Sequence, residues 1–225
     1  FGIFKKILMV KKKNILITGS SRGIGLSIAE KLYKDEYNQI FINGRNKKKL
    51  VNLKKKKLSN CEIALGDINN STVLKKINKK IKRLDVLICN IGSGKSKKTG
   101  KETKQDWEKS LSQNFYSSVN TIKVFEKKLI KSKGIIICIS SICGMEFIKG
   151  APITYSVSKA ALNAFVRFYS KHLGAKGVKL NAIAPGNILF KGSTWEKKLQ
   201  KNKRMTLNQI DQEVSLKRFG TAEDI

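Results

Sequence analysis

Apolar positions along the chain follow two different periods. Short runs such as ILIT and IIICIS are apolar at consecutive positions, which is typical of strands buried on both faces of a parallel sheet. Between them lie longer stretches in which apolar residues recur as they do in amphipathic helices, with lysines at the other positions. The predicted strands cover residues 14–18, 39–43, 61–65, 86–90, 134–140 and 178–184. The predicted helices cover residues 23–33, 47–57, 71–81, 105–131 and 154–173.

This alternation predicts the fold class. Six strands joined by helices at this spacing indicate an α/β fold with a doubly wound parallel sheet between two layers of helices, a three-layer αβα arrangement. No linker and no internal repeat interrupts the pattern, so we expect residues 13–225 to form a single domain. Residues 1–12 precede the first strand and are interpreted as an N-terminal extension.

The composition adds a strong positive charge. The 225 residues include 47 Lys and Arg against 16 Asp and Glu, which gives a formal net charge of +31. Such a charge raises the question of a nucleic-acid partner. However, 41 of these 47 cations are lysines spread over the whole chain, and Asn and Ile are abundant too, a bias that A/T-rich codons produce. We therefore do not expect a nucleic acid as partner.

Neither a membrane span nor a metal site is expected. No apolar run approaches the ~20 residues that a membrane-spanning helix needs. Cys61, Cys89, Cys138 and Cys143 form no C-x-x-C pair, and three of them lie in apolar runs. We interpret them as small buried side chains in a reducing compartment and predict a cytoplasmic protein.

A glycine-rich turn follows the first predicted strand and opens the first predicted helix. Gly19 permits the tight turn, Gly23 lets the backbone approach a pyrophosphate, and Gly25 permits close packing of helix on strand. The N-terminus of the helix then favours the bound anion. The turn is therefore predicted to bind a dinucleotide, with a cofactor-binding set of Gly19, Ser21, Arg22, Gly23, Ile24 and Gly25.

The end of the second strand indicates which dinucleotide. An NAD site usually has an acidic residue there for the ribose 2′-hydroxyl. This strand ends in the sequence FINGR, without a carboxylate, and Arg45 and Arg22 could instead bind a 2′-phosphate. We predict NADP(H) as the cofactor. The alternative is that Arg45 is an ordinary solvated cation.

A second glycine-rich segment, residues 92–96, reads GSGKS and is similar to the end of a triphosphate-binding P-loop. The leading glycine of that motif would stand where this chain has Cys89. The segment also follows the fourth predicted strand instead of the first. We interpret it as a loop beside the cofactor cleft.

Tyr155 and Lys159 share one face of the last predicted helix because they are four residues apart. A free tyrosine has a pKa of ~10. A cation ~4 Å away at an effective dielectric of ~20 contributes ~4 kcal/mol, which equals about three pKa units. We therefore expect Lys159 to bring the pKa of Tyr155 near 7.

Several motifs stand together in the order and spacing of the short-chain dehydrogenase/reductase family, which the chain resembles from about residue 13 to its last residue. The resemblance implies the Rossmann-like fold and hydride transfer with a dinucleotide. The motifs are the glycine turn, the segment at residues 90–92, Asn114, Ser141, the Tyr155–Lys159 pair, Pro185–Gly186 and the closing residues 216–224.

The resemblance also implies roles for four catalytic residues. Tyr155 would be the general acid or base at the carbonyl oxygen, and Ser141, followed by Gly144, would hold that oxygen. Neighbouring Ser140 is one residue out of register. Lys159 would lower the pKa of Tyr155 and bind the nicotinamide ribose. Asn114 would hold a water that links Lys159 to solvent.

The remaining cofactor contacts also follow from the resemblance. Asp67 is similar to the adenine contact of the family, and Asn90 to the residue that shapes the loop on the cofactor side. The alternatives are a turn-forming Asp and a strand-end Asn. The predicted cofactor-binding set beyond the glycine turn comprises Arg45, Asp67, Asn90, Gly92, Tyr155, Lys159, Pro185 and Gly186.

The chain departs from the family pattern at three places. Ile91 replaces a smaller residue and is expected to narrow the floor of the cleft. Phe190 stands where the family often has a Thr that contacts the nicotinamide amide, in a loop interpreted as a mobile substrate lid. Phe190 and Trp195 would either line a pocket or pack without touching substrate. Finally, members usually carry a further strand, so the domain is expected to be truncated at Ile225.

Together these features predict an NADPH-dependent oxidoreductase that reduces a ketone or aldehyde carbonyl. The expected substrate is a 3-oxoacyl group on a carrier protein, as in fatty acid biosynthesis. A sugar or polyol ketone of the same family is an alternative, and so is a non-catalytic dinucleotide- or RNA-binding protein on this fold. The expected partners are a small-molecule or carrier-protein-bound carbonyl substrate and further copies of the chain, in a homodimer or homotetramer.

Overall fold

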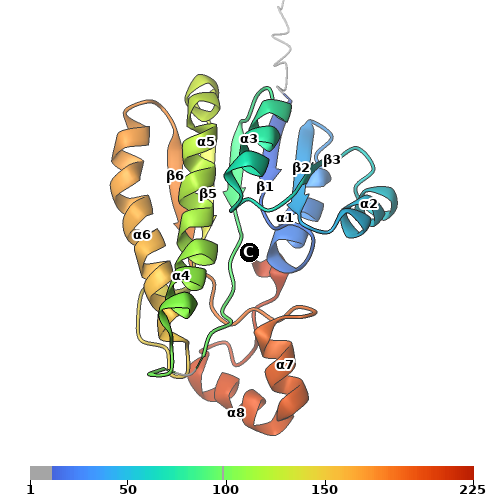
Figure 1. The fold of residues 1–225 in the computed structure, drawn as a ribbon. Helices are drawn as coiled ribbons and strands as arrows, with labels where there is room; N and C mark the ends of the chain where they lie inside the picture. Colours follow the sequence, from blue (N-terminus) through green and yellow to red (C-terminus); the bar gives the residue numbers. More distant parts are fainter. Residues whose placement is uncertain (1–11, 98) are drawn as a thin grey trace, which may run out of the picture.

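A computed structural model describes residues 12–97 and 99–225, and a single parallel sheet organises them (Figure 1). The six strands lie in the order β3-β2-β1-β4-β5-β6, and every neighbouring pair is parallel. This confirms the predicted doubly wound sheet. The predicted extension at residues 1–12 lies, apart from Lys12, outside the described residues. The strands are β1 (Lys13–Ile17), β2 (Asn38–Gly44), β3 (Glu62–Leu65), β4 (Val86–Cys89), β5 (Ile135–Ile139) and β6 (Lys179–Ile183).

Helices cover both faces of the sheet, and two apolar cores result. Successive residues of a strand point to opposite faces, so Ile15 and Ile17 join one core while Leu16 joins the other. The first core packs under α1 (Gly23–Tyr33) and α2 (Lys47–Lys56). The helices over the other face are α3 (Ser71–Lys80), α5 (Ser117–Ser132) and α6 (Ile153–Gly174). These layers confirm the αβα sandwich.

The predicted helix over residues 105–131 is helical throughout but not α-helical throughout. It consists of α4 (Lys104–Leu111), a π-helical segment (Ser112–Tyr116) and α5. Asn114 lies in the wider turns of this segment, fully buried, and its amide nitrogen donates to the carbonyl oxygen of Ser110 at 3.0 Å. Wider turns of this kind often occur at functional sites.

The chain beyond β6 also differs from the prediction. The segment that the sequence indicated as a loop is followed by α7 (Thr194–Lys201) and α8 (Lys203–Glu213), which lie beyond the carboxyl edge of the sheet (Figure 1). Short 3₁₀ turns at Ile142–Gly144 and Ala222–Asp224 complete the described elements.

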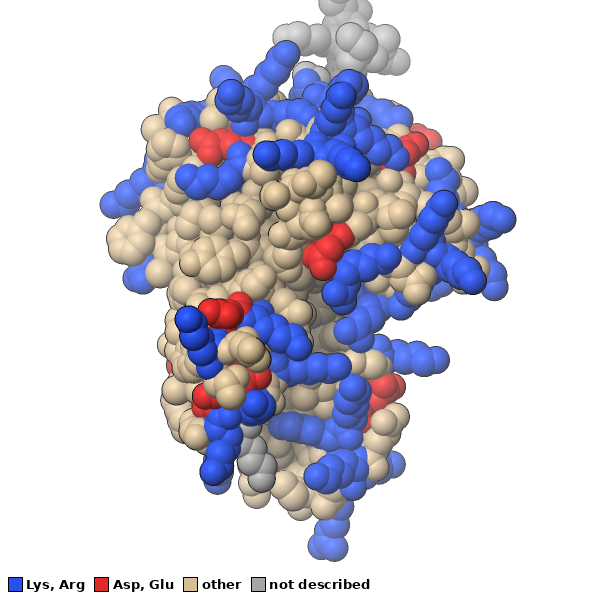
Figure 2. Space-filling model, viewed as in Figure 1, with Lys and Arg blue, Asp and Glu red and all other residues tan. Residues whose placement is uncertain are grey.

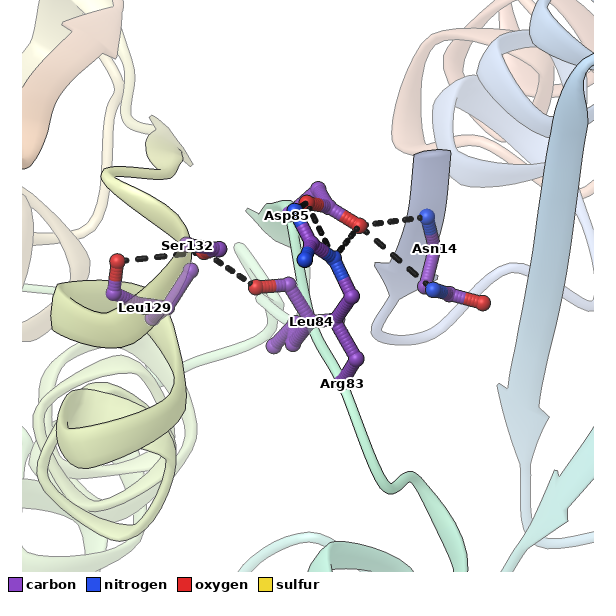
Figure 3. A network of polar contacts seen from close by, with 6 residues as sticks. All are labelled: Asn14, Arg83, Leu84, Asp85, Leu129 and Ser132. Atoms are coloured by element: carbon purple, nitrogen blue, oxygen red, sulfur yellow. Dashed lines mark hydrogen bonds and ion pairs between the residues drawn. The ribbon is translucent and has the colours of Figure 1, made fainter. Parts of the chain in front are cut away.

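The amino edge of the sheet is closed by a polar network around Asp85 (Figure 3). Its carboxylate accepts hydrogen bonds from the backbone nitrogen of Asn14 at 3.0 Å and from Arg83 Nη2 at 2.6 Å. Ser132 at the end of α5 donates to the carbonyl oxygen of Leu84 at 2.6 Å. The network thus ties the starts of β1 and β4 to α5, at the edge remote from the predicted site.

Among the described residues, no helix is both long and apolar enough to cross a membrane, and no group of three His, Cys, Asp or Glu side chains could hold a metal ion. Cys61, Cys89 and Cys138 are buried, as the sequence predicted, whereas Cys143 is only partly buried, and all four are free thiols. Lys and Arg side chains cover much of the face drawn in Figure 2 and do not gather in one stripe.

Candidate active site

A cleft of about 840 Å³ opens at the carboxyl edge of the sheet. Ligands of open α/β sheets bind in this position, and the volume lies in the range of ~300–1,000 Å³ typical of ligand sites. Most of the residues predicted from the sequence line it. They are Gly19, Ser21, Arg22, Ile24, Arg45, Asp67, Asn90, Gly92, Ser141, Tyr155, Lys159, Pro185 and Gly186.

The glycine turn at one end of the cleft needs its glycines. Gly19 and Gly23 have φ angles of +64° and +56°, which side chains rarely adopt. Gly25 does not line the cleft: a Cβ there would lie 2.4 Å from Nδ2 of Asn90, which holds the turn from behind by donating to the carbonyl oxygen of Thr18 at 3.0 Å. The N-terminus of α1 is thereby presented to the cleft.

Asn43 also supports this turn, and the sequence reasoning missed it. Its side-chain oxygen accepts from the backbone nitrogen of Gly19 at 3.1 Å, and its amide nitrogen donates to the carbonyl oxygen of Ala64 at 2.7 Å. Asn43 is buried. The signal available was a polar residue inside an apolar strand that ends at a ligand-binding edge.

Two predicted phosphate ligands, Arg22 and Arg45, also line the cleft. Arg45 Nη1 lies 3.6 Å from Asp67 Oδ2, and the Arg45 side chain is 76% exposed. Arg22 Nη1 donates to the carbonyl oxygen of Gly192 at 3.2 Å. Asn69 lines the same region, and its buried Oδ1 has no hydrogen-bond partner in the part of the chain that the structure describes. The two guanidinium groups and a turn without side chains fit the phosphates of a dinucleotide. The Asn69 oxygen only accepts hydrogen bonds, so it could bind a donor group of a ligand but not a phosphate.

Ser141 and Tyr155 meet at the other end of the cleft. Ser141 follows β5 and caps the 3₁₀ turn, with its Oγ accepting from the backbone nitrogen of Cys143 at 3.2 Å. Tyr155 lies in the first turn of α6. Burial raises the pKa of Tyr155, and a hydrogen bond with Ser141 opposes this rise. Ser140 points elsewhere, because its hydroxyl donates to Asn163 Oδ1 at 2.5 Å.

Lys159 lies one turn further along α6 and is only 3% exposed. Its Nζ donates to the carbonyl oxygen of Ile139 at 2.7 Å and lies 5.9 Å from the centre of the Tyr155 ring. Burial lowers the pKa of Lys159 to about 8. The expectation that this cation brings the pKa of Tyr155 near 7 is therefore wrong for this structure. The ammonium group faces a backbone carbonyl of β5, and burial dominates at the phenol.

Asn114 stands behind the cleft instead of lining it. Its Oδ1 accepts from the backbone nitrogen of Ser93 at 2.7 Å. A Cβ on Gly92 would lie 3.1 Å from this oxygen and 3.3 Å from Lys159 Nζ, so both side chains lie close to Gly92. The segment at residues 92–96 is a loop that follows β4 and contributes to the cleft, as the sequence predicted.

Residues 187–193, which we name the strap, were expected to be part of a mobile lid. In the structure the strap is joined to the end of the chain, where Ile188 pairs with Gly220 and the backbone nitrogen of Leu189 donates to the carbonyl oxygen of Gly220 at 2.8 Å. Trp195, at the start of α7, lines the cleft and packs against Phe219 with ring centres 5.3 Å apart.

Comparison with known proteins agrees with this geometry. A family model described as short chain dehydrogenase matches residues 13–203. The chain is 33% identical to the 3-oxoacyl-[acyl-carrier-protein] reductase of Rickettsia typhi over 216 residues, which cover 95% of this chain and 86% of that protein.

Solved structures with the same fold include YwfH, an NADPH dependent reductase involved in bacilysin biosynthesis, at a TM-score of 0.85 and 26% identity over 95% of this chain and 88% of that one. Another is L-sorbose reductase from Gluconobacter frateurii, at a TM-score of 0.85 and 24% identity, which covers 95% of this chain and 86% of that one. The resemblance drawn from the motifs is thus confirmed, and the chain belongs to the short-chain dehydrogenase family of oxidoreductases.

Proposed function

We propose that this oxidoreductase is an NADPH-dependent reductase of a ketone or aldehyde carbonyl, with Asn114, Ser141, Tyr155 and Lys159 as its catalytic set. One observation carries the proposal. Ser141, Tyr155 and Lys159 converge at one end of a single cleft whose other end holds the glycine turn. A dinucleotide that spans the cleft would therefore reach the hydroxyl pair with its reactive ring.

The choice of NADP(H) rests on the charges around the turn. No carboxylate ends β2, and Arg45 and Arg22 line the cleft on the side of the turn. Guanidinium groups bind phosphate with two parallel hydrogen bonds, whereas the ribose hydroxyl of NAD prefers a carboxylate. The description of YwfH as an NADPH dependent reductase supports the same choice.

The bound dinucleotide would supply the hydride. The protein then has to hold the substrate oxygen and protonate it. Ser141 would donate a hydrogen bond to that oxygen, and Tyr155 would transfer its proton to it. Tyr155 is protonated at neutral pH and can therefore donate its proton in the direction of reduction, while the raised pKa makes it a weaker acid than a free tyrosine. Lys159 would bind the nicotinamide ribose, and Asn114 would position a water for proton resupply.

For the substrate, we propose a 3-oxoacyl thioester on a carrier protein, because the Rickettsia typhi relative carries this activity in its name. Ile148 and Trp195 give the cleft apolar surface for an acyl chain. A cytoplasmic location and assembly into a homodimer or homotetramer stay predictions from the sequence.

The test is NADPH oxidation with three kinds of substrate: an acetoacetyl thioester, a sugar ketone and a small aldehyde. We expect turnover of the thioester and loss of turnover in Tyr155→Phe with NADPH binding retained. Faster turnover of the sugar ketone would assign the alternative substrate class. Absence of turnover with every substrate, or full activity of Tyr155→Phe, would refute the proposal.

A further inference from the structure

The ring of Phe190 covers the second glycine of the turn. A Cβ built on Gly23 would lie only 2.6 Å from Cε2 of Phe190 and 2.8 Å from Cδ2, so the ring lies directly against this glycine. Gly23 is the position whose missing side chain lets the backbone approach a pyrophosphate. The phenyl ring therefore occupies the surface over Gly23 that a bound pyrophosphate would need.

A second contact joins the strap to the same turn. Arg22, which the sequence assigns to the 2′-phosphate, donates instead to the carbonyl oxygen of Gly192 in the strap at 3.2 Å. Gly192 has a φ of +82°, and a Cβ there would lie 3.0 Å from this guanidinium nitrogen. Arg22 and Gly23, which are neighbours in the turn, are thus contacted by Gly192 and Phe190 of the strap.

The strap is built to hold this position. The backbone nitrogen of Ser193 donates to the carbonyl oxygen of Phe190 at 2.9 Å, and the backbone nitrogen of Gly192 donates to Glu196 Oε2 at 2.7 Å. Ser193 also caps α7 by accepting from the backbone nitrogen of Glu196 at 3.1 Å. The pairing with Gly220 fixes the other end, so the ring is presented to Gly23 by an ordered segment.

We propose that Phe190 and the dinucleotide compete for Gly23, so that Phe190 sets the affinity of the protein for its cofactor. Binding requires the ring to leave the turn, and it frees Arg22 from Gly192 at the same time. The phenyl ring offers no hydrogen bond to a pyrophosphate in return. The inference rests on the proposed function only in taking the cofactor to be a pyridine dinucleotide.

Competition ties the size of the effect to the fraction of molecules in which the ring covers the turn. If the covered turn outnumbers the open turn by about ten to one, the apparent Kd is raised about tenfold. Replacing Phe190 by Ala removes the competitor and is expected to lower the Kd by about tenfold, or about 1.4 kcal/mol. NADPH and NADH share the pyrophosphate, so both Kd values are expected to fall by similar factors.

The experiment is calorimetric titration of the purified protein with NADPH and with NADH, without carbonyl substrate, for wild type, Phe190→Ala and Phe190→Thr. The control is Phe168→Ala, because this side chain on α6 is 71% exposed and remote from the turn. We expect unchanged Kd values for the control. Thermal unfolding without dinucleotide is expected to show a lower Tm for Phe190→Ala, since the ring loses its contacts with Gly23.

An unchanged or higher Kd in both Phe190 variants would overturn the inference, because the ring would then support the bound dinucleotide. If the Ala variant does not fold, the smaller change to Thr gives the same answer. Tighter binding together with inactivity toward every carbonyl would uphold the competition and refute the proposed reaction. Failure of the wild type to bind either dinucleotide would refute both.

Discussion

Replacement of the buried cation Lys159 by Met is expected to stabilise the fold at neutral pH while it removes activity. Lys159 is 3% exposed, and no carboxylate among the described residues lies within ion-pair distance of its Nζ. Its one hydrogen-bond acceptor in that part of the chain is the carbonyl oxygen of Ile139 at 2.7 Å. A buried charge with so little compensation opposes folding.

The lowered pKa gives the size of this effect. Burial moves the pKa of Lys159 from 10.5 to about 8. One pKa unit equals ~1.36 kcal/mol, so the charged form costs about 3 kcal/mol of folding free energy below pH 8. Between pH 8 and 10.5 the unfolded chain still holds this proton and the folded chain has lost it. Stability due to Lys159 therefore rises with pH across this window.

Met has a similar length and carries no charge, so it removes the desolvation cost and fills most of the same space. It also leaves the carbonyl oxygen of Ile139 without its donor, which costs about 1–3 kcal/mol. At pH 7 the net gain is therefore between about 0 and 2 kcal/mol. The change of this gain with pH is a clearer test than its size at pH 7, because the cost of the lost hydrogen bond changes little with pH.

The assay is urea unfolding, followed by the fluorescence of Trp107 and Trp195, for wild type and Lys159→Met from pH 7 to pH 10. The advantage of the variant is expected to shrink by up to about 3 kcal/mol over this range. Lys104→Met is the control, since its side chain is 90% exposed and removing it relieves no desolvation. A Lys159 variant that is less stable than wild type by a constant amount at every pH would refute the reasoning.

Three further predictions concern other parts of the molecule. Tyr155→Phe is expected to lower kcat by about 10²–10⁴-fold and to leave the Kd for NADPH unchanged, as steady-state rates and titration would show. Arg45→Ala is expected to raise the Kd for NADPH about tenfold and leave that for NADH unchanged. Asp85→Asn is expected to lower the free energy of unfolding by about 1–3 kcal/mol at pH 7. Burial opposes ionisation of Asp85, but bonds from Arg83 and Asn14 outweigh it and lower its pKa. The stabilisation by Asp85 is therefore present above its unfolded pKa of ~3.9. As the pH falls below this value, acid unfolding should show the difference in unfolding free energy between wild type and variant becoming smaller.

The fold could be predicted because its signals are local. Consecutive apolar positions and helical periodicity depend only on which faces are buried, and α1 begins and ends where the pattern indicates. The π-helical segment could not be found in this way, because one wider turn shifts the period over only a few residues. For α7 a signal was present: Ser193 and Glu196 have the spacing of a capping box.

The site was predicted as a set of residues but not as a set of contacts. The spacing of Tyr155 and Lys159 placed both on one face of a helix. The direction of the Lys159 ammonium depends on a carbonyl of β5, and that acceptor is 20 residues away in the sequence. Likewise, no local pattern connects Phe190 with Gly23, since their contact requires the whole sheet to bring the strap over the turn.

The two edges of the sheet differ in a way that locates function without reference to any relative. At the amino edge, Asp85 has its charge matched and its oxygens bonded, so the edge contributes to stability. Around the cleft at the carboxyl edge lie groups that oppose folding: glycines at positive φ, the buried cation Lys159 on α6 and, within the part of the chain that the structure describes, the Asn69 oxygen without a partner. A fold retains such features where they act on a ligand. A measured stabilisation by Lys159→Met would therefore be an argument that Lys159 is kept for chemistry.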